Sequence, residues 1–308
     1  MRILLLGSTG YLGGHVAERL RALPGVRLLR GGRAPDDDHR IDLAGITTDA
    51  LAEQLSKAAP DAVVNCAGTV SGTTLNLAEV NSRGPAVLCE ALRAAAPDAR
   101  LVHLGSAAEY GPRGAGERTP EDTPARPVTP YGATKLAGTL AVLEARIDAL
   151  VLRVTEPVGP GAPPAGLPGR LTAELSRAVA RSPHGTLRAG DLSAYRDFVD
   201  VRDVAQAVAL ALALPGRLPR LLNIGSGRAA PARDLAHGLA DAAGFTGDIE
   251  ETPGAADRPT AVPWQCSDIT AAEWELGWRP RFTLRESLAA LWASDGAPLL
   301  APATGDPA

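Results

Sequence analysis

Residues 2–14 read Arg-Ile-Leu-Leu-Leu-Gly-Ser-Thr-Gly-Tyr-Leu-Gly-Gly. The apolar run that ends at Leu6 predicts a short strand buried on both faces of a parallel sheet. Gly7, Gly10 and Gly13 follow this strand and precede a helical pattern that reaches about Leu23. Glycine lets the backbone approach a pyrophosphate closely, and the N-terminus of the following helix stabilises the negative charge. The stretch predicts a dinucleotide site, although a tight turn without a ligand would give the same spacing.

Strand-like and helix-like patterns continue to alternate as far as residue 155. Further strands are expected at 26–29, 61–65, 100–105 and 150–154, and helices at 48–58, 75–96 and from Tyr131 onward. Such alternation predicts an α/β protein with a doubly wound, Rossmann-type parallel sheet. From Glu156 to Gly169 the sequence is rich in proline and glycine and the alternation stops. We therefore expect a dinucleotide-binding domain at 1–155 plus about 197–225, a smaller interleaved substrate-binding lobe at 156–196 and 226–296, and a loose tail at 297–308.

The later part of the chain also contains recognisable elements. Helices are expected at 171–180, 203–213, 232–243 and 284–292, a strand at 221–225, and an irregular polar segment at 249–278. Gly244 is expected to end its helix, because glycine accepts the left-handed conformation that is common at that position.

The end of the second strand bears on the choice of dinucleotide. An acidic residue there would bind the 2′-hydroxyl of NAD, but the chain has Arg30 and Arg33. Guanidinium groups bind a 2′-phosphate well, so the pattern favours NADP(H), with NAD(H) possible. The alternative is that both arginines are surface residues paired with the acidic residues at 36–38.

The stretch Thr129-Pro130-Tyr131-Gly132-Ala133-Thr134-Lys135 predicts catalytic chemistry. Thr129 suits a helix N-cap and Pro130 the first turn, so Tyr131 and Lys135 fall on one helical face. A lysine ammonium beside a phenol favours the phenolate and lowers its pKa, which suits a general acid or base. Ser106 ends a predicted buried strand and is expected at the same edge of the sheet as the glycine turn. The alternative for Tyr131 and Lys135 is an ordinary capped helix.

Composition excludes several classes of protein. The 308 residues are 45% hydrophobic and 21% charged, with a net charge of −4, which is typical of a globular domain and gives no reason to expect nucleic-acid binding. The three cysteines have no metal-binding spacing and suggest free thiols in a reducing compartment, and no metal site is expected. The apolar run at 3–6 is too short for a signal peptide or a membrane span, so we expect a cytoplasmic protein.

Taken together, these motifs resemble the extended short-chain dehydrogenase/reductase family, which includes NAD-dependent epimerase/dehydratase-like enzymes of nucleotide-sugars. The resemblance spreads along most of the chain: the glycine turn, Asp42-Leu43, Asn65-Cys66-Ala67-Gly68, Ser106 four residues before Tyr110-Gly111, Tyr131-x-x-x-Lys135, Arg196-Asp-Phe-Val, Asn223-Ile-Gly-Ser-Gly and Leu276-Gly-Trp-Arg-Pro. It implies that Tyr131 exchanges a proton with the substrate oxygen, that Lys135 assists it and holds the nicotinamide ribose, and that Ser106 binds the reacting carbonyl. The implied cofactor-binding residues are Gly7, Thr9, Gly10, Tyr11, Leu12, Gly13, Arg30, Arg33, Asp42, Leu43, Cys66, Ala67, Gly68, Asn81, Tyr131 and Lys135. For Asn81 the alternative is a buried helix residue bonded to backbone.

The residues after Ser106 limit the types of reaction that we expect. Dehydratases of this family carry an Asp-Glu pair where this chain has Ala107-Ala108, and epimerase-reductases carry a cysteine nearby. Because alanine transfers no proton, a dehydratase is not expected. The resemblance then implies a ketoreductase, and we predict that it acts on C4 of a nucleotide-linked 4-keto-6-deoxy sugar. Alternatives are a nucleotide-sugar 4-epimerase with bound NAD, a reductase of a non-sugar natural-product ketone or, in a different class, a non-catalytic dinucleotide sensor.

The resemblance also implies a substrate site and a partner. Ser106, Ala107, Glu156, Arg196 and Arg258 are the expected substrate-binding residues, and the two arginines suit a diphosphate. Each arginine could instead form a structural ion pair. Glu156 replaces an amide that commonly contacts the diphosphate, and its carboxylate would repel phosphate unless paired or turned away. Family members commonly form homodimers through the helices at about 75–96 and 131–147, and no membrane partner is expected.

Overall fold

The computed structural model describes residues 1–182, 184–251 and 262–296. Its main feature is a sheet of seven parallel strands in the order β10-β6-β5-β4-β1-β2-β3. The strands are β1 (Arg2–Leu6), β2 (Arg27–Gly32), β3 (His39–Arg40), β4 (Ala62–Asn65), β5 (Arg100–Ser106), β6 (Ala149–Val154) and β10 (Leu221–Ile224). A three-stranded sheet has the order β11-β9-β7 and comprises β7 (Glu156–Val158), β9 (Tyr195–Asp200) and β11 (Ala229–Pro231).

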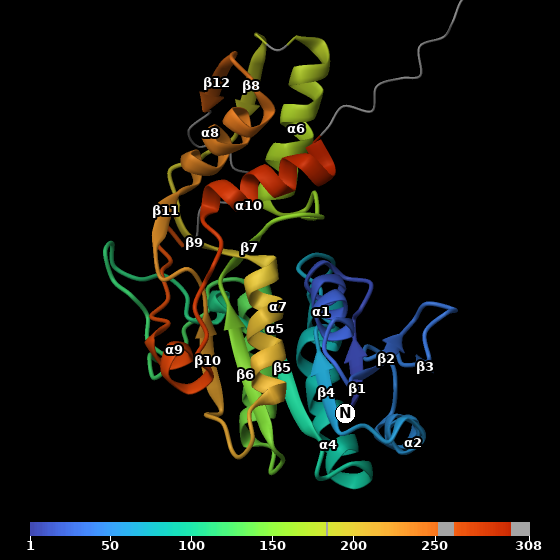
Figure 1. The fold of residues 1–308 in the computed structure, drawn as a ribbon. Helices are drawn as coiled ribbons and strands as arrows, with labels where there is room; N and C mark the ends of the chain where they lie inside the picture. Colours follow the sequence, from blue (N-terminus) through green and yellow to red (C-terminus); the bar gives the residue numbers. More distant parts are fainter. Residues whose placement is uncertain (183, 252–261, 297–308) are drawn as a thin grey trace, which may run out of the picture. The chain divides into compact units, whose positions relative to one another are not determined.

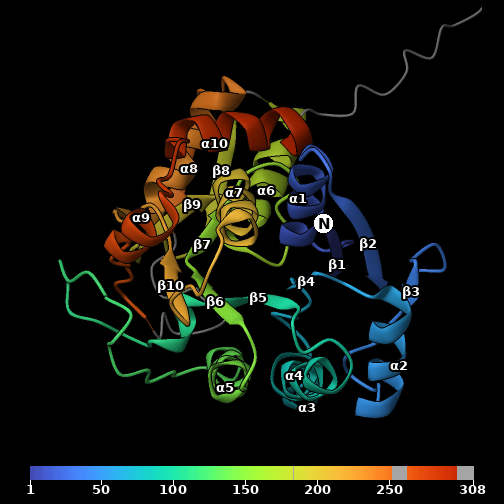
Figure 2. The same cartoon turned by 60° about the horizontal axis from the view of Figure 1, so that its bottom comes forward.

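Helices cover both faces of the seven-stranded sheet (Figure 2). One face packs α1 (Tyr11–Arg21), α7 (Val201–Ala213) and α9 (Thr270–Leu276), and the other packs α2 (Thr48–Ala58), α4 (Gly84–Ala95) and α5 (Pro130–Glu144). Along β1, Ile3 and Leu5 belong to the first core, whereas Leu4 and Leu6 belong to the second. Because successive strand residues point to opposite faces, a continuous apolar run is what this two-sided burial requires.

Several expected elements match the structure closely. The helices at 48–58 and 232–243 have the expected bounds, and Gly244 ends the second of them with a left-handed φ of +63°. Thr129 caps α5 by accepting a hydrogen bond from the Gly132 nitrogen, with Pro130 in the first turn. These local signals act through neighbouring residues, which is why they could be found in the sequence.

Other elements differ from expectation. The single helix expected at 75–96 is three consecutive segments: α3 (Thr74–Ala78), the π-helix η1 (Glu79–Arg83) and α4. The strand expected at 26–29 continues to Gly32, since residues 31 and 32 pair with β3. Within the segment expected to be irregular at 249–278, β12 (Asp248–Glu251) and α9 form, because β12 pairs with β8 (Thr186–Ala189) and α9 buries Ala272 and Leu276.

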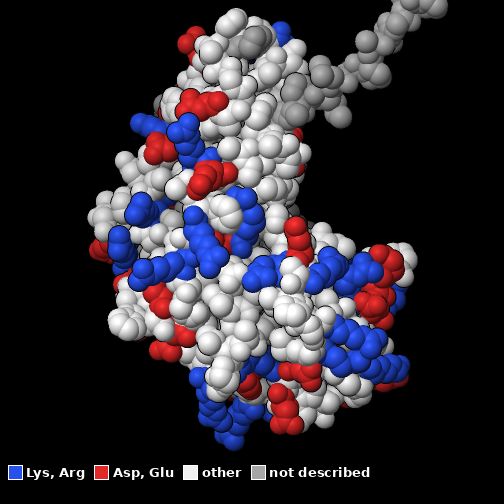
Figure 3. Space-filling model, in the orientation of Figure 1, with Lys and Arg blue, Asp and Glu red and all other residues white. Residues whose placement is uncertain are grey.

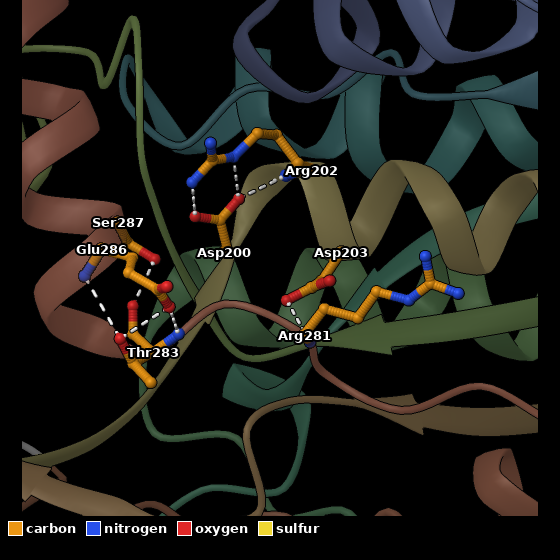
Figure 4. A network of polar contacts seen from close by, with 7 residues as sticks. All are labelled: Asp200, Arg202, Asp203, Arg281, Thr283, Glu286 and Ser287. Atoms are coloured by element: carbon orange, nitrogen blue, oxygen red, sulfur yellow. Dashed lines mark hydrogen bonds and ion pairs between the residues drawn. The ribbon is translucent and has the colours of Figure 1, made fainter.

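The chain divides into two compact units. The first comprises Met1–Pro157, Tyr195–Ala230 and Thr260–Arg281. The described residues 262–281, expected in the substrate lobe, belong to this unit, and Trp278 and Arg281 are bonded to α7. The Asp203 backbone oxygen accepts from Trp278 Nε1 at 2.9 Å. Figure 4 shows the second bond, in which the Asp203 carboxylate accepts from the Arg281 nitrogen at 3.0 Å.

The second unit comprises Val158–Ala194, Pro231–Pro259 and Phe282–Ala308. Its described elements are α6 (Leu167–Arg181), β8, α8 (Ala232–Ala243), β12 and α10 (Leu284–Leu291), labelled in Figure 1, and the π-helix η3 (Trp292–Gly296). A capping box starts α10, because Thr283 and Glu286 each bond the other's backbone nitrogen (Figure 4). The tail expected at 297–308 lies outside the described residues.

Acidic and basic side chains are interspersed over the described part of the face drawn in Figure 3. Exposed ion pairs join Arg93 to Glu90 and Lys57 to Glu53. No helix in the described part of the chain is long and apolar enough to cross a membrane.

Candidate active site

The glycine turn fits a bound pyrophosphate. Gly7 has a φ of +79°, and a Cβ atom there would lie 2.7 Å from the Ala67 nitrogen. A Cβ atom on Gly13 would lie 2.0 Å from the Gly7 oxygen, so side chains at both positions are excluded. Gly10 is the N-cap of α1 and supplies no side-chain cap. The N-terminus of a helix without a side-chain cap suits an anionic ligand, as the expected dinucleotide requires.

The other predicted residues of this turn lie beside Gly10 and at the start of α1. Thr9 is exposed beside Gly10, while Tyr11 and Leu12 open α1 and are half-buried. The Tyr11 ring contacts that of His15 edge-on at 5.9 Å.

The two arginines predicted on the adenine side of the site differ in their contacts. Arg30 pairs with Asp36 at 2.9 Å, and its backbone nitrogen donates to Asp38. Arg33 is exposed, and among the described residues it pairs with no carboxylate. The alternative of an arginine paired with neighbouring acids therefore describes Arg30 but not Arg33.

The loop that contains Asp42 and Leu43 is hydrogen-bonded to the π-helix η1. Asp42 is exposed and Leu43 is buried. Arg83 of η1 donates hydrogen bonds to the carbonyl oxygens of Leu43, Ala44 and Ile46. Arg83 was not among the predicted site residues, since no local signal links it to a loop almost 40 positions earlier.

Asn81 organises the loop that follows β4. This buried side chain accepts from the Thr69 nitrogen at 3.0 Å and donates to the Thr69 oxygen at 2.8 Å and to Thr134 Oγ1 at 3.3 Å. The predicted segment Cys66-Ala67-Gly68 lies immediately before Thr69, so Asn81 fixes its course and ties it to α5. Asn81 is thus a buried helix residue bonded mostly to backbone, and that backbone belongs to the loop predicted to contact the cofactor.

Ser106 and Tyr131 meet at the end of β5. A hydrogen bond with Ser106 lowers the pKa of the Tyr131 phenol, but burial outweighs it and raises that pKa to about 12. The Ser106 Oγ also accepts from the Ala108 nitrogen at 3.2 Å, within a short 3₁₀ helix, η2 (Ala107–Glu109), that begins with the buried Ala107. The phenol is thus kept in its protonated form beside a second hydroxyl.

Lys135 is buried on the same face of α5, four residues after Tyr131. Its Nζ donates to the Leu104 oxygen at 2.5 Å, and burial lowers its pKa. The lysine lies near Cys66, where burial raises the pKa of the thiol to about 12 and the ammonium opposes that rise. Lys135 is not among the groups that shift the pKa of the phenol, and that pKa is raised rather than lowered as the sequence had led us to expect.

Glu156 and Arg196 lie near one another in the predicted substrate region. Burial raises the pKa of the Glu156 carboxyl, and the Arg196 charge opposes this rise. Glu156 also raises the pKa of Tyr131, which places its charge within reach of the phenol. The two side chains form no close ion pair, and Arg196 Nη1 donates to the Tyr195 oxygen at 2.8 Å. Arg258 lies outside the described residues.

Glu109 is a site residue that the sequence analysis did not identify. It is fully buried, it forms a capping box with Ser106, and its carboxylate is paired with Arg153 Nε at 2.7 Å. The signal was present, because Ser106-x-x-Glu109 has the spacing of a capping box.

The sheet, the glycine turn and the Ser-Tyr-Lys set define a nicotinamide-dinucleotide-dependent enzyme with a Rossmann-type fold. Residues 3–225 match the model of the NAD dependent epimerase/dehydratase family, and the chain belongs to this family. The predicted doubly wound fold and the predicted membership of the extended short-chain dehydrogenases/reductases are confirmed.

Individual relatives cover nearly the whole chain. It is 37% identical to dTDP-6-deoxy-L-talose 4-dehydrogenase (NAD(P)(+)) of Kitasatospora kifunensis, over 95% of both chains. It is 29% identical to GDP-6-deoxy-D-mannose reductase of Pseudomonas aeruginosa, over 94% of this chain and 95% of the relative. The solved structure of RMD from Pseudomonas aeruginosa complexed with NADPH superposes with a TM-score of 0.82 at 25% identity, covering 96% of this chain and 98% of the other. UDP-glucose 4-epimerases are also among the similar proteins.

Proposed function

We propose that this protein reduces the 4-keto group of a nucleotide-linked 4-keto-6-deoxy sugar to an alcohol, with NADPH as the preferred dinucleotide. The observation that carries the proposal is the Ser106–Tyr131 pair, in which burial keeps the phenol protonated. A ketone reduction consumes one proton at the carbonyl oxygen, and a neutral phenol beside a hydroxyl donor suits that step.

The protein's own groups perform the proton chemistry. Ser106 donates a hydrogen bond to the ketone oxygen and orients it, and Tyr131 transfers its phenolic proton to that oxygen as the alcohol forms. Solvent then restores the proton on Tyr131. When bound, the nicotinamide supplies the hydride that reaches the ketone carbon, leaving the oxidised dinucleotide. The glycine turn, the loop after β4 and Lys135 would hold the dinucleotide.

The preference for NADPH rests on Arg33. It is exposed after β2, near where the adenosine ribose binds in this fold, and no carboxylate of the described residues neutralises it. Arg30 contributes less, because Asp36 already engages its guanidinium.

The absence of a second acid–base pair supports a simple reductase. Ala107 and Ala108 follow Ser106, and neither can transfer the proton that an elimination needs. Similarity to UDP-glucose 4-epimerases keeps a 4-epimerase as the second candidate. An epimerase would convert an alcohol substrate to its C4 epimer without consuming added dinucleotide.

The proposed substrate carries a diphosphate that Arg196 binds. Arg196 is half-buried and donates one hydrogen bond to backbone, so other guanidinium N–H groups remain for phosphate oxygens. Glu156 lies close to this cation and to Tyr131, and burial favours its neutral form. A carboxyl group that is readily protonated reduces the repulsion between a diphosphate and this position.

The test is oxidation of NADPH, followed at 340 nm, with a dTDP-linked or GDP-linked 4-keto-6-deoxy sugar. The proposal predicts stoichiometric oxidation of NADPH and formation of a 4-hydroxy product. Conversion of a UDP-hexose to its C4 epimer, with no net change in dinucleotide, would replace the reductase by the epimerase.

We also propose that the protein is a cytoplasmic homodimer that associates through α4 and α5. A groove of about 300 Å³ lies between these helices, lined by Ala86, Cys89, Glu90, Arg93, Ala141, Glu144, Ala145, Arg146 and Ile147. Leu140 of α5 is 49% exposed, and a second copy packed on this face would cover it. The three free thiols fit a reducing compartment.

A further inference from the structure

Glu109 is a carboxylate without solvent exposure, three residues after Ser106. Burying a charge is costly unless it is paired and hydrogen-bonded, so its partners indicate what it holds in place. Those partners come from β5, α5 and β6, the elements that carry or flank the proposed reaction site.

One carboxylate oxygen joins β5 to α5. Glu109 Oε1 accepts from the Ser106 nitrogen at 2.8 Å and from Thr139 Oγ1 at 2.9 Å. Thr139 lies four residues after Lys135 and eight after Tyr131 on α5, hence on a common face. A single atom therefore connects the backbone of Ser106 to the helix that carries Tyr131 and Lys135.

The other carboxylate oxygen joins this pair of elements to β6. Glu109 Oε2 accepts from Arg153 Nε at 2.7 Å, and the guanidinium lies 4.4 Å from the centre of the Tyr110 ring. The Tyr110 hydroxyl in turn donates to Asn223 of β10 at 2.8 Å. Arg153 is only 4% exposed, so the pair is a buried one that strongly resists separation.

The Glu109 charge also acts on the catalytic groups. It raises the pKa of Lys135, against the lowering by burial, and it raises the pKa of Tyr131. The other titratable groups that face these two are Cys66 and His103 near Lys135, and Glu156 near Tyr131. Among these groups, Glu109 alone acts on both Lys135 and Tyr131.

We infer that Glu109 is a positioning residue of the reductase: its carboxylate fixes Ser106 against α5 and balances the Lys135 ammonium. Only the expected effect on kcat rests on the proposed function. In its absence Ser106 could shift relative to Tyr131, and a displacement of about 1 Å costs on the order of a hundredfold in rate.

The first experiment replaces Glu109 by glutamine, which keeps the shape and one acceptor but removes the charge. Glu109→Gln is expected to lower kcat about ten- to a hundredfold while the KM for the ketone and the Kd for NADPH stay within about twofold. The alkaline limb of the kcat profile moves to lower pH, because Tyr131 loses a neighbouring negative charge that favours its protonated form. Unchanged kcat would overturn the inference.

A second measurement does not depend on the substrate. Lys57 and Lys135 are the only lysines in the sequence, so ¹³Cε-labelled lysine gives two signals, and Lys57→Arg assigns them. The Lys135 titration is expected at lower pH in Glu109→Gln than in the parent, and an unmoved titration contradicts the electrostatic half of the inference. Because no substrate is needed, this titration tests the effect of Glu109 on Lys135 even if the protein reduces no nucleotide-linked ketone.

Two further variants separate positioning from stability. Glu109→Gln leaves Arg153 buried without its partner, so the double variant with Arg153→Met is expected to recover Tm while kcat stays low. Recovery of kcat together with Tm would make Glu109 merely structural. The matched control Glu53→Gln removes an exposed carboxylate 2.7 Å from Lys57, and it is expected to leave kcat and the Lys135 titration unchanged.

Discussion

Lys135 Nζ donates a 2.5 Å hydrogen bond to the Leu104 carbonyl oxygen, so the lysine is held against β5. The pKa of the Tyr131 phenol is set by burial, by Ser106 and by the charges of Glu109 and Glu156. Tyr131 and Lys135, on one face of α5, therefore have different roles. Tyr131 is kept protonated, and Lys135 supplies a buried cation at the edge of the sheet.

This arrangement predicts opposite pH dependences for the two directions of the reaction. With its pKa raised to about 12, the phenol remains protonated through neutral and moderately alkaline pH, so kcat/KM for ketone reduction should change less than about twofold between about pH 7 and about pH 9. Oxidation of the product alcohol needs the phenolate and should accelerate as pH rises. Initial rates in both directions across this range provide the check, and a reduction rate that falls from about pH 7 upward would contradict the account.

Arg33 is expected to select NADPH. Arg33→Ala should raise the KM for NADPH about tenfold and leave that for NADH within about twofold, because a charge-assisted contact to the 2′-phosphate is lost. Arg30→Ala is the matched control, and its effect should be smaller since Asp36 already engages that side chain. A preference for NADH in the parent protein would contradict this assignment and favour the epimerase.

Arg196 and Glu156 should have opposite effects on nucleotide binding. Arg196→Met is expected to raise the Ki of a nucleoside diphosphate inhibitor at least about tenfold. Glu156→Gln should lower it by no more than about threefold, because burial already favours the neutral carboxyl group beside the phosphates. Arg27→Met, at the amino end of β2 and away from the proposed site, should leave the Ki unchanged. The same response to Arg27→Met and Arg196→Met would show general charge attraction rather than a site.

Leu140 should contribute to a dimer interface. Leu140→Arg is expected to convert a dimer to monomers in sedimentation velocity, because an unpaired charge would be buried between copies of α5. Trp274→Arg provides a control, since Trp274 of α9 is 83% exposed and lies outside the proposed interface. Sedimentation of the parent as a monomer would refute the proposed association.

The sequence was sufficient where the determining interactions are local. Gly7 and Gly13 admit no Cβ atom, and the caps at Thr129 and Gly244 use neighbouring backbone groups. Alternation of buried strands with helices also predicted the sheet, since burial on both faces requires continuous apolar runs such as 3–6.

The remaining features depend on contacts between distant positions. The π-helix η1 interrupts the helix expected at 75–96, where Asn81, Ser82 and Arg83 bond Thr69, Thr134 and the loop at 43–46. Arg30 and Arg33 look equivalent in sequence, and only the fold of residues 33–38 shows that Asp36 engages Arg30. The direction in which the Tyr131 pKa is shifted also depends on tertiary structure, because burial raises it whereas Lys135 was expected to lower it.

The most direct test of the central claim is the rate at which Tyr131→Phe consumes NADPH with a nucleotide-linked 4-keto-6-deoxy sugar. Loss of the proton donor should lower kcat about a hundred- to ten-thousandfold, with NADPH still bound within about threefold of the parent affinity. A Tyr131→Phe variant that retains near-parental reductase turnover would contradict the assignment of Tyr131 as the proton donor.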